Sequence, residues 1–504
     1  MKYKCSIIIL SALISISSCK EIENIKNQER KPNIIIIYAD DLGIGDVSSY
    51  GSTELITPNI DRIANEGIKF TNGYATSPTC TPSRYSILSG IYPFRKKGAQ
   101  ILPGNAPLLF DLGEQTLPSM LGDAGYFTGV IGKWHLGLGD ENLDWNEEVS
   151  PGPLEIGFDY SYVMASTNDR VPSVYVKNHN IVNLDPNDPI EVSYKNNFEG
   201  EPTGKENPEM LKLHPSHGHD MSIHNGISRI GFMRGGKDAL FIDEDMADDF
   251  LLEAKNYITD HQNESFFLFY SLHQPHVPRV PHPRFKGSSG LGPRGDVIVE
   301  ADWDVGQLLD HLDLLGLSES TIVIFSSDNG PVLDDGYIDE AVTKIGKHTP
   351  SGSLRGGKYS LFDAGTHVPF MIRWKGTIEP GISDALVCQI DFTASFAALA
   401  EQENKTIDSE NILDAFLGRS DVGRGNLILG QNNITAFRQG DWVLIPPHKG
   451  PKIFGYVNIE SGRDSIYQLY NIKDDVGQKN NLASEIPDKV KEMEKELKRI
   501  KSKI

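Results

Sequence analysis

A cysteine, a proline and an arginine stand together in Cys80-Thr81-Pro82-Ser83-Arg84, directly before an apolar run that suits a helix. Pro82 fits the first helical turn, where its missing N–H is not needed. A helix beginning here would direct free N–H groups and its positive dipole end toward Cys80, so an anion could bind beside the thiol. A buried cysteine in a turn explains this stretch alone equally well, because free cysteine is among the most buried residue types.

Polar residues also follow four expected strands at the points where those strands end. They are Asp40-Asp41, Gly132-Lys133-Trp134-His135, His273-Gln274-Pro275-His276 and Asp328-Asn329-Gly330. In open α/β sheets, ligands bind beyond the carboxyl ends of the strands. The sequence therefore predicts that these side chains meet at one edge of a sheet.

Four of these residues offer oxygen ligands: Asp40, Asp41, Asp328 and Asn329. Oxygen ligands suit a hard cation, calcium or magnesium, rather than zinc. Three carboxylates would neutralise such an ion and leave one side of it for an anionic substrate. Either pair alone could be a solvated turn or a helix cap, but both pairs follow a buried strand, and this favours a metal site.

Positive charge and proton donors are supplied by Lys133, His135, His276 and Lys358. These groups suit an oxyanion whose negative charge shifts during group transfer. A second group of histidines could imitate a zinc cluster, although a polar loop that lines a substrate pocket is the favoured interpretation; these are His214, His217, His219 and His224.

The elements that must position these residues alternate between short apolar strands and helices. Strands are expected at Asn33–Tyr38, Phe127–Ile131, Phe266–Ser271, Thr321–Ser326 and Val368–Arg373, and helices at Pro58–Glu66, with Thr57 as N-cap, and Glu244–Ile258. Near-continuous apolar strands are typical of a largely parallel sheet covered by helices on both faces, which is an α/β fold. Residues 140–240 lack a clear period and are expected to form long loops above the sheet.

The alternation of apolar strands and helices ends at about residue 404. Short antiparallel strands are expected at Leu427–Gln431, Thr435–Arg438 and Asp441–Ile445, the last two joined at Gln439-Gly440, and a charged amphipathic helix over 487–504. We therefore expect a catalytic domain at 32–404 and a smaller C-terminal α+β subdomain with an antiparallel sheet at 405–504.

The first 19 residues are typical of an export signal. Lys2 and Lys4 precede an apolar run from Ile7 to Ile16, which is too short to span a bilayer. Cys19 follows Ile-Ser-Ser as in a bacterial lipobox, which predicts a lipoprotein signal peptide at 1–19 with Cys19 lipidated; ordinary cleavage nearby is the alternative. Residues 20–31 are expected to be a tether. The protein would be exported to the periplasm or the outer surface and held at the membrane by its lipid anchor alone.

The net charge and the cysteine content argue against several classes of protein. The formal net charge is -21, from 48 basic and 69 acidic residues, which argues against a general nucleic-acid binder. An anionic substrate would therefore need a locally positive or metal-bearing site. Besides Cys5 and Cys19 in the signal, only Cys80 and Cys388 remain, so a disulfide framework is excluded. A single bridge between them stays open but disfavoured, because Cys388 lies in a buried apolar run.

Taken in order, these motifs resemble the type I sulfatases, the arylsulfatase-like, formylglycine-dependent branch of the alkaline phosphatase superfamily. The signature C-x-P-S-R is matched by Cys80 to Arg84 and continues as Tyr85-Ser86-Ile87-Leu88-Ser89-Gly90. Further matches are Asp40-Asp41-Leu42-Gly43, Gly129 to Gly137, Asp328-Asn329-Gly330, Leu469-Tyr470-Asn471-Ile472 and Asn480-Asn481-Leu482. The resemblance implies an alkaline phosphatase-like sheet sandwiched by helices.

The resemblance also implies roles for individual residues. A maturation enzyme would oxidise Cys80 to formylglycine, whose hydrate supplies the nucleophile. Calcium, rather than magnesium, would be held by Asp40, Asp41, Asp328, Asn329 and the modified Cys80. Arg84 would stabilise the hydrate, Lys133 would grip hydrate and sulfate, His276 or Lys358 would protonate the leaving alcohol, and His135 would take the second proton. His273, Asn168, Asp169 and Arg170 are expected to contact substrate.

We therefore expect a sulfuric ester hydrolase that removes sulfate from a carbohydrate, since an exported lipoprotein meets polysaccharides. A phosphonate or phosphodiester hydrolase of the same superfamily is the alternative, because some of those enzymes also use formylglycine. A non-catalytic glycan-binding lipoprotein is disfavoured, because every expected catalytic residue is present. The sequence leaves open which sugar and position are desulfated, and whether cleavage is at chain ends or within chains.

Overall fold

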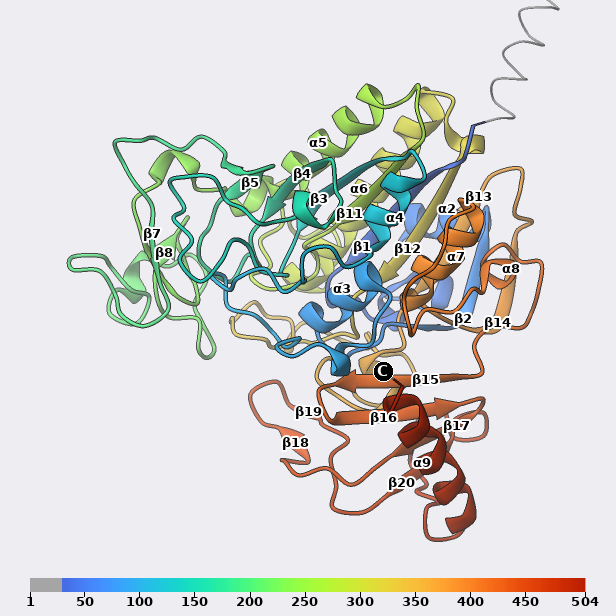
Figure 1. The fold of residues 1–504 in the computed structure, drawn as a ribbon. Helices are drawn as coiled ribbons and strands as arrows, with labels where there is room; N and C mark the ends of the chain where they lie inside the picture. Colours follow the sequence, from blue (N-terminus) through green and yellow to red (C-terminus); the bar gives the residue numbers. More distant parts are fainter. Residues whose placement is uncertain (1–29, 504) are drawn as a thin grey trace, which may run out of the picture.

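A ten-stranded sheet forms the centre of the protein in the computed structural model, which describes residues 30–503 (Figure 1). The strand order across the sheet is β14 (Gly381–Cys388), β2 (Ile68–Tyr74), β13 (Phe370–Trp374), β12 (Thr321–Ser327), β1 (Asn33–Ala39), β11 (Phe266–Ser271), β3 (Phe127–Lys133), β4 (Tyr160–Met164), β5 (Tyr175–Lys177) and β6 (Asn180–Ile181). All five strands expected from the sequence are present, within two residues at each end.

The middle of this sheet is parallel and its margins are mixed. Strands β12, β1, β11, β3 and β4 run in parallel, whereas β13 is antiparallel to both of its neighbours. In β1 the side chains of Ile34 and Ile36 join one hydrophobic core, and those of Ile35 and Ile37 join the other. A strand buried on both faces therefore explains the unbroken apolar run.

Helices cover both faces of the sheet (Figure 1). One face carries α2 (Pro58–Asn65), α5 (Met246–Asp260) and α6 (Gly292–Leu314), and the other carries α3 (Cys80–Ser89), α4 (Leu117–Asp123), α7 (Phe392–Leu399) and α8 (Leu413–Phe416). Thr57 is the N-cap residue of α2, but its side chain makes no capping bond. The carboxylate of Asp302 in α6 accepts the N–H groups of Asn59 and Ile60 instead, at 2.9 and 2.8 Å.

The segment 140–240 is more regular than its sequence predicts. Strands β4, β5 and β6 extend the large sheet, β7 (Glu191–Ser193) pairs with β10 (Phe232–Arg234), and β8 (Ile223–His224) pairs with β9 (Ile227–Ser228). The expectation of loops alone was wrong for these strands. They are two to five residues long, which is too short for a clear alternating pattern, and β4, β7 and β10 also depend on partners about 30 or more residues away.

A four-stranded antiparallel sheet forms the C-terminal part, in the order β15 (Asn426–Gln431), β16 (Ile434–Gln439), β17 (Trp442–Ile445) and β20 (Gln468–Asn471). Helix α9 (Pro487–Lys501) packs on it, and a small hairpin joins β18 (Ile453–Phe454) to β19 (Ile459–Glu460) (Figure 1). The expected turn at Gly440 is confirmed, with φ 56°. The boundary expected after residue 404 stays a proposal; residues 412–417 still contribute to the core of the large sheet.

Within residues 30–503, no helix is long and apolar enough to cross a membrane. The proposed signal peptide and Cys19 lie outside the described residues, as does most of the proposed tether.

Candidate functional site

The carboxyl ends of four neighbouring strands bring the expected polar residues together. Asp40-Asp41 follows β1, Lys133 ends β3, His276 lies beyond β11, and Asp328-Asn329 follows β12. The loops are also bonded to one another, since the N–H of Asp40 donates to the carbonyl of Gln274 at 3.0 Å and the N–H of Asp328 donates to that of Ala39 at 3.1 Å. The prediction that these ends meet at one edge of the sheet is confirmed.

Three carboxylates meet at the centre of this edge. Oxygen atoms of Asp40, Asp41 and Asp328 lie within 4.8 Å of one another, and the three residues are at most 1% exposed. Like charges at this separation repel by about 4 kcal/mol per pair at an effective dielectric constant of about 20. Burial and the neighbouring Asp328 raise the pKa of Asp40 well above its usual range.

The donor set fits a divalent cation. Oδ1 of Asp40 and Oδ1 of Asn329 are buried without a hydrogen-bond partner among the described residues. Buried oxygens of this kind need a partner. With the other carboxylate oxygens they offer hard ligands only, which suits calcium or magnesium and not zinc.

Three buried cations surround the carboxylates. Lys133 Nζ bonds Asp40, and Lys358 Nζ donates to Asp41 and to Asp335, at 2.8 Å each. Burial alone would lower the pKa of Lys358, but Asp335 and Asp41 raise it well above its ordinary value. These cations offset most of the carboxylate charge and place positive groups beside the acidic centre, where an anion can meet them.

Arg84 is the third cation, and it is rigidly held. Its Nε donates to Asp328 Oδ2 at 3.0 Å, and its Nη1 donates to Ser271 Oγ at 2.5 Å. Burial raises the pKa of Asp328, but Arg84 and Lys133 outweigh it and hold that pKa below the ordinary value. A guanidinium fixed on two sides can present its remaining donors to an oxyanion in a constant orientation.

Cys80 is the first residue of α3, as the sequence predicts, and it is 1% exposed. Its Sγ and ligand atoms of Asp40 and His276 lie within 4.8 Å of one another. Both Cys80 and Cys388 are free thiols, so the disfavoured bridge is not formed. Burial raises the pKa of the Cys80 thiol to about 12, although Lys133 and Lys358 act in the opposite direction. The thiol is therefore protonated at neutral pH and is a weak nucleophile.

Cys80 lies at the wall of a cavity of about 250 Å³. Its wall also contains the two expected proton-transfer histidines and Lys358, together with Asp169, Arg170, His217, His219, Asp335, Tyr359 and Tyr456. Burial, with Lys133 nearby, lowers the pKa values of His135 and His276 well below the ordinary range. We call this space the catalytic cavity.

Two of the four expected substrate contacts line the catalytic cavity. Asp169 accepts hydrogen bonds from Arg170 Nη1 at 2.8 Å and shares one with His219 Nε2 at 2.9 Å. Asn168 and His273 are also buried, but they are not among the residues that line this cavity. Asn168 Nδ2 donates to the carbonyl of Pro278 at 3.1 Å instead.

The histidine-rich segment does not assemble a zinc site among the described residues. His217 and His219 line the catalytic cavity, whereas His224 Nδ1 bonds Ser173 Oγ at 2.9 Å. The interpretation as a polar loop beside the pocket is confirmed for the first two. Ser271, Asp335, Tyr359 and Tyr456 were missed; only Asp335, in the turn Asp334-Asp335-Gly336, carried a visible signal.

A family model described as Sulfatase matches residues 32–402. The chain belongs to the sulfatase family. Members hydrolyse sulfate esters, and this is the activity of the present chain. The resemblance read from Cys80 to Arg84 and from the strand-end carboxylates is thereby confirmed.

Known relatives agree with this assignment. N-acetylgalactosamine-6-O-sulfatase of Bacteroides thetaiotaomicron is 49% identical over 479 residues, which are 94% of each chain. Arylsulfatase A of Bos taurus is 31% identical over 399 residues, covering 79% of this chain and 70% of the relative. A solved structure from the metabolism of glycosaminoglycans by Bacteroides thetaiotaomicron matches with a TM-score of 0.93 and 49% identity, covering 94% of this chain and all of the other. The expected alkaline phosphatase-like fold is thus confirmed.

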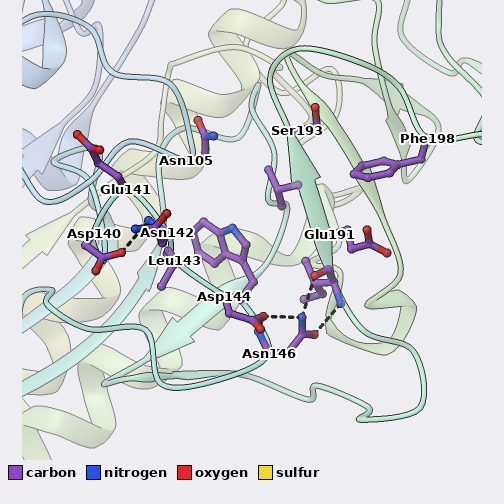
Figure 2. Close-up of a pocket in the computed structure, with 13 residues that line it drawn as sticks. Asn105, Asp140, Glu141, Asn142, Leu143, Asp144, Asn146, Glu191, Ser193 and Phe198 are labelled. Carbon is purple, nitrogen blue, oxygen red and sulfur yellow. Dashed lines mark hydrogen bonds between the residues drawn. The ribbon is translucent and has the colours of Figure 1, made fainter.

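The sulfatase also has a larger cavity, of about 570 Å³, and the described residues that line it include none of the expected catalytic residues. Figure 2 shows its acidic side chains, which include Asp140, Glu141, Asp144 and Glu191. No lysine or arginine is among the described residues that line it. A cavity of this charge repels an anion, so size alone does not identify the place where a sulfate ester binds.

The loop after Asp41 is anchored by a buried ion pair. Asp46 Oδ2 accepts from the N–H of Gly43 at 2.8 Å, and both carboxylate oxygens of Asp46 accept from Arg294, at 2.7 and 2.6 Å. His348 Nε2 lies 2.7 Å from the same carboxylate. Asp41 itself has φ 63°, a conformation rare for a residue with a side chain, and the anchored loop helps to maintain it.

We expect Arg294→Met to lower the free energy of unfolding of the sulfatase by about 3–5 kcal/mol, because it leaves the buried carboxylate of Asp46 without its main partner. Arg62→Met is the matched control: Arg62 pairs with the exposed Asp310, and its loss should cost less than about 1 kcal/mol. Denaturant titration of both variants measures the difference. Equal free energies of unfolding for the two variants would show that the ion pair between Asp46 and Arg294 does not stabilise the fold.

Proposed function

We propose that this sulfatase removes O-sulfate groups from carbohydrates, using formylglycine made from Cys80 and a calcium ion held by Asp40, Asp41, Asp328 and Asn329. The observation that carries the proposal is the position of Cys80. It is the first residue of a helix at the wall of a cavity that also contains Arg170 and Lys358, and its Sγ lies within 4.8 Å of ligand atoms of Asp40 and His276. A nucleophile at this position can reach a sulfate that the cations bind.

The protonated thiol of Cys80 is poorly suited to the reaction, which supports its conversion by a maturation enzyme before or during folding. The hydrated aldehyde of formylglycine supplies a hydroxyl nucleophile and a route back to the aldehyde, and calcium supplies positive charge beside the sulfate. The two orphaned oxygens of Asp40 and Asn329 support the metal site. Calcium suits this set better than magnesium, which keeps more of its own water.

Arg84 and Lys133 would position the reacting groups. The guanidinium of Arg84, fixed by Asp328 and Ser271, would hold the oxygens at position 80 in one orientation. Lys133 Nζ lies against Asp40 at the same edge and would bring positive charge to position 80 and to the sulfate. Both residues act by fixed electrostatics and require no rearrangement during the reaction.

His135 is suited to accept a proton. Its Nε2 lies 3.0 Å from the carbonyl of Leu102, which can only accept, so Nε2 carries the hydrogen and Nδ1 is left as a base. Nδ1 has no hydrogen-bond partner among the described residues. His135 would therefore take the proton from position 80 that allows sulfate to leave.

His276 and Lys358 are the candidates for protonating the departing alcohol. Lys358 carries a proton in its bonds to Asp41 and Asp335. His276 Nδ1 donates to the carbonyl of Val277 at 2.6 Å, so its Nε2 needs a second proton before it can act as an acid. Both residues line the catalytic cavity and stay in the proposal.

The carbohydrate substrate is supported by the relatives. The 49% identical sulfatase is named for N-acetylgalactosamine 6-O-sulfate, and the matching solved structure comes from glycosaminoglycan metabolism. Asp169 and Arg170 at the cavity wall are suited to bind sugar hydroxyls, and we propose them, together with the buried Asn168 and His273, as the substrate-recognising group. Export as a lipoprotein through the signal at 1–19 would place the enzyme where such glycans occur.

Free sulfate released from a panel of sulfated mono- and oligosaccharides tests the proposal, with N-acetylgalactosamine 6-O-sulfate as the first member. The enzyme is produced together with a maturation enzyme, and formylglycine at position 80 is verified by mass spectrometry. We expect release from one sugar and position. Release of phosphate from phosphodiesters or phosphonates, with no sulfate from any sugar, would contradict the carbohydrate assignment and favour the phosphoester alternative.

A further inference from the structure

A second groove adjoins the catalytic cavity, and the two share one residue, Tyr456. The groove has a volume of about 370 Å³, within the range of about 300–1,000 Å³ that is usual for small-molecule sites. The acidic pair in the turn also connects them, because Asp335 lines the catalytic cavity and Asp334 lines the groove. The two spaces therefore lie on either side of Tyr456 and of the Asp334-Asp335 turn, so a ligand long enough to pass this ring from the catalytic cavity would reach the groove.

Tyr456 comes from the C-terminal part of the chain. It lies in the turn between β18 and β19, the small hairpin labelled in Figure 1, and is 49% exposed. Its ring centre is 5.9 Å from that of Tyr359 and 5.9 Å from that of Phe454. His217 lies 5.8 Å away as well, and these contacts are edge-on or tilted, so about half of Tyr456 stays exposed and can serve as an aromatic platform for a ligand.

The lining of the groove differs in charge from that of the catalytic cavity. Its walls are largely apolar, with Val332, Leu333, Val342 and Ile459 among them, and Asp334 is the one charged side chain among the described residues that line it. The catalytic cavity, by contrast, holds Arg170 and Lys358. A sulfate group would meet a carboxylate and no cation in the groove, whereas the apolar C–H face of an unsulfated ring would meet apolar walls.

We infer that the groove is a binding site for the unsulfated sugar ring attached to the sulfated one, and that Tyr456 is the platform on which the substrate passes from one to the other. The inference rests on the proposed function, since it assumes a sulfated sugar in the catalytic cavity. The inference gives the hairpin of β18 and β19 a role in substrate specificity. An aryl group has an apolar face, as a sugar ring does. An aryl glycoside is therefore included in the test as the alternative ligand for the groove.

The test compares N-acetylgalactosamine 6-O-sulfate, a disaccharide in which the same sugar is linked to an unsulfated sugar, and its 4-nitrophenyl glycoside. The readout is the ratio of kcat/KM for the disaccharide to that for the monosaccharide. We expect Tyr456→Ala to lower this ratio by a factor of about 5 to 10, mainly through KM, as for the loss of one aromatic contact. Tyr456→Phe retains the ring and should retain the ratio.

A second variant blocks the groove without altering Tyr456. Val342 is 56% exposed at the groove, so Val342→Trp adds an indole there with little risk to folding, and the ratio should fall again. An unchanged ratio in both Tyr456→Ala and Val342→Trp overturns the inference. If the two substitutions lower kcat/KM only for the 4-nitrophenyl glycoside and not for the disaccharide, the groove binds an aryl group, and the assignment to a sugar is wrong. If the unsubstituted enzyme releases no sulfate from any probe, the proposed function fails first, and the inference fails with it.

Discussion

Cys80→Ala is expected to lower sulfate release by a factor on the order of 10⁵ or more, because it removes the atom from which the nucleophile is made. Alanine cannot be oxidised to an aldehyde, so no maturation enzyme can restore the activity. The side chain is buried and small, and its loss should leave the fold intact. Sulfate release is measured by ion chromatography on the substrate that the panel identifies.

Cys388→Ala is the matched control for this experiment. Cys388 is the other free, buried cysteine in residues 30–503, and it packs in the hydrophobic core beneath the C-terminal sheet. The same change there should leave turnover within about twofold of the unsubstituted enzyme, since it removes one sulfur atom from a core and none from the site. Substantial sulfate release by Cys80→Ala would refute the proposed nucleophile. Cys80→Ser should fold and be inactive unless the maturation enzyme accepts serine.

Asp328→Ala is expected to weaken metal binding strongly and to abolish turnover. It removes one of three converging carboxylates and leaves Arg84 without its main partner, so the site becomes less negative by one charge. We expect metal affinity to fall by a factor on the order of 100 or more, since even residues behind a metal ligand can account for that much. The calcium content after dialysis, measured by atomic emission, reports the loss of metal affinity without an activity assay.

Asp335→Ala separates this metal site from a competing one. Asp335, Asp41 and His276 also bring their ligand atoms within 4.8 Å of one another, so a cation could be held there instead. Asp335, however, bonds both Lys358 and the hydroxyl of Tyr359, which leaves it fewer free oxygens for an ion. We expect Asp335→Ala to keep its calcium and Asp328→Ala to lose it. The reverse result would move the metal to the side of Lys358.

Much of the site could be predicted because its polar residues lie in short segments of the sequence. Asp40-Asp41 and Asp328-Asn329 each follow a run of buried strand residues, and a strand buried on both faces leaves a clear apolar signal. Ser271 was missed because a serine at the end of a strand is common, and Asp335 was missed because its signal, an acidic pair before a glycine, also occurs in ordinary surface turns. Their roles appear only when Arg84 and Lys358 are seen to bond them.

The central parallel strands and the sulfatase family could be predicted from the amino-acid sequence, because they depend on local apolar runs and on motifs in a fixed order. Tertiary structure alone decided the antiparallel direction of β13, the pairing of β2 with β14 about 300 residues later, and the arrival of Tyr456 at the cavity. Pairing between distant segments depends on which complementary surfaces meet in the folded chain, and the local pattern of a strand does not identify its partner. Position in the fold, more than residue type, thus separates Asp335 beside the reacting groups from the aspartates of the larger, acidic cavity.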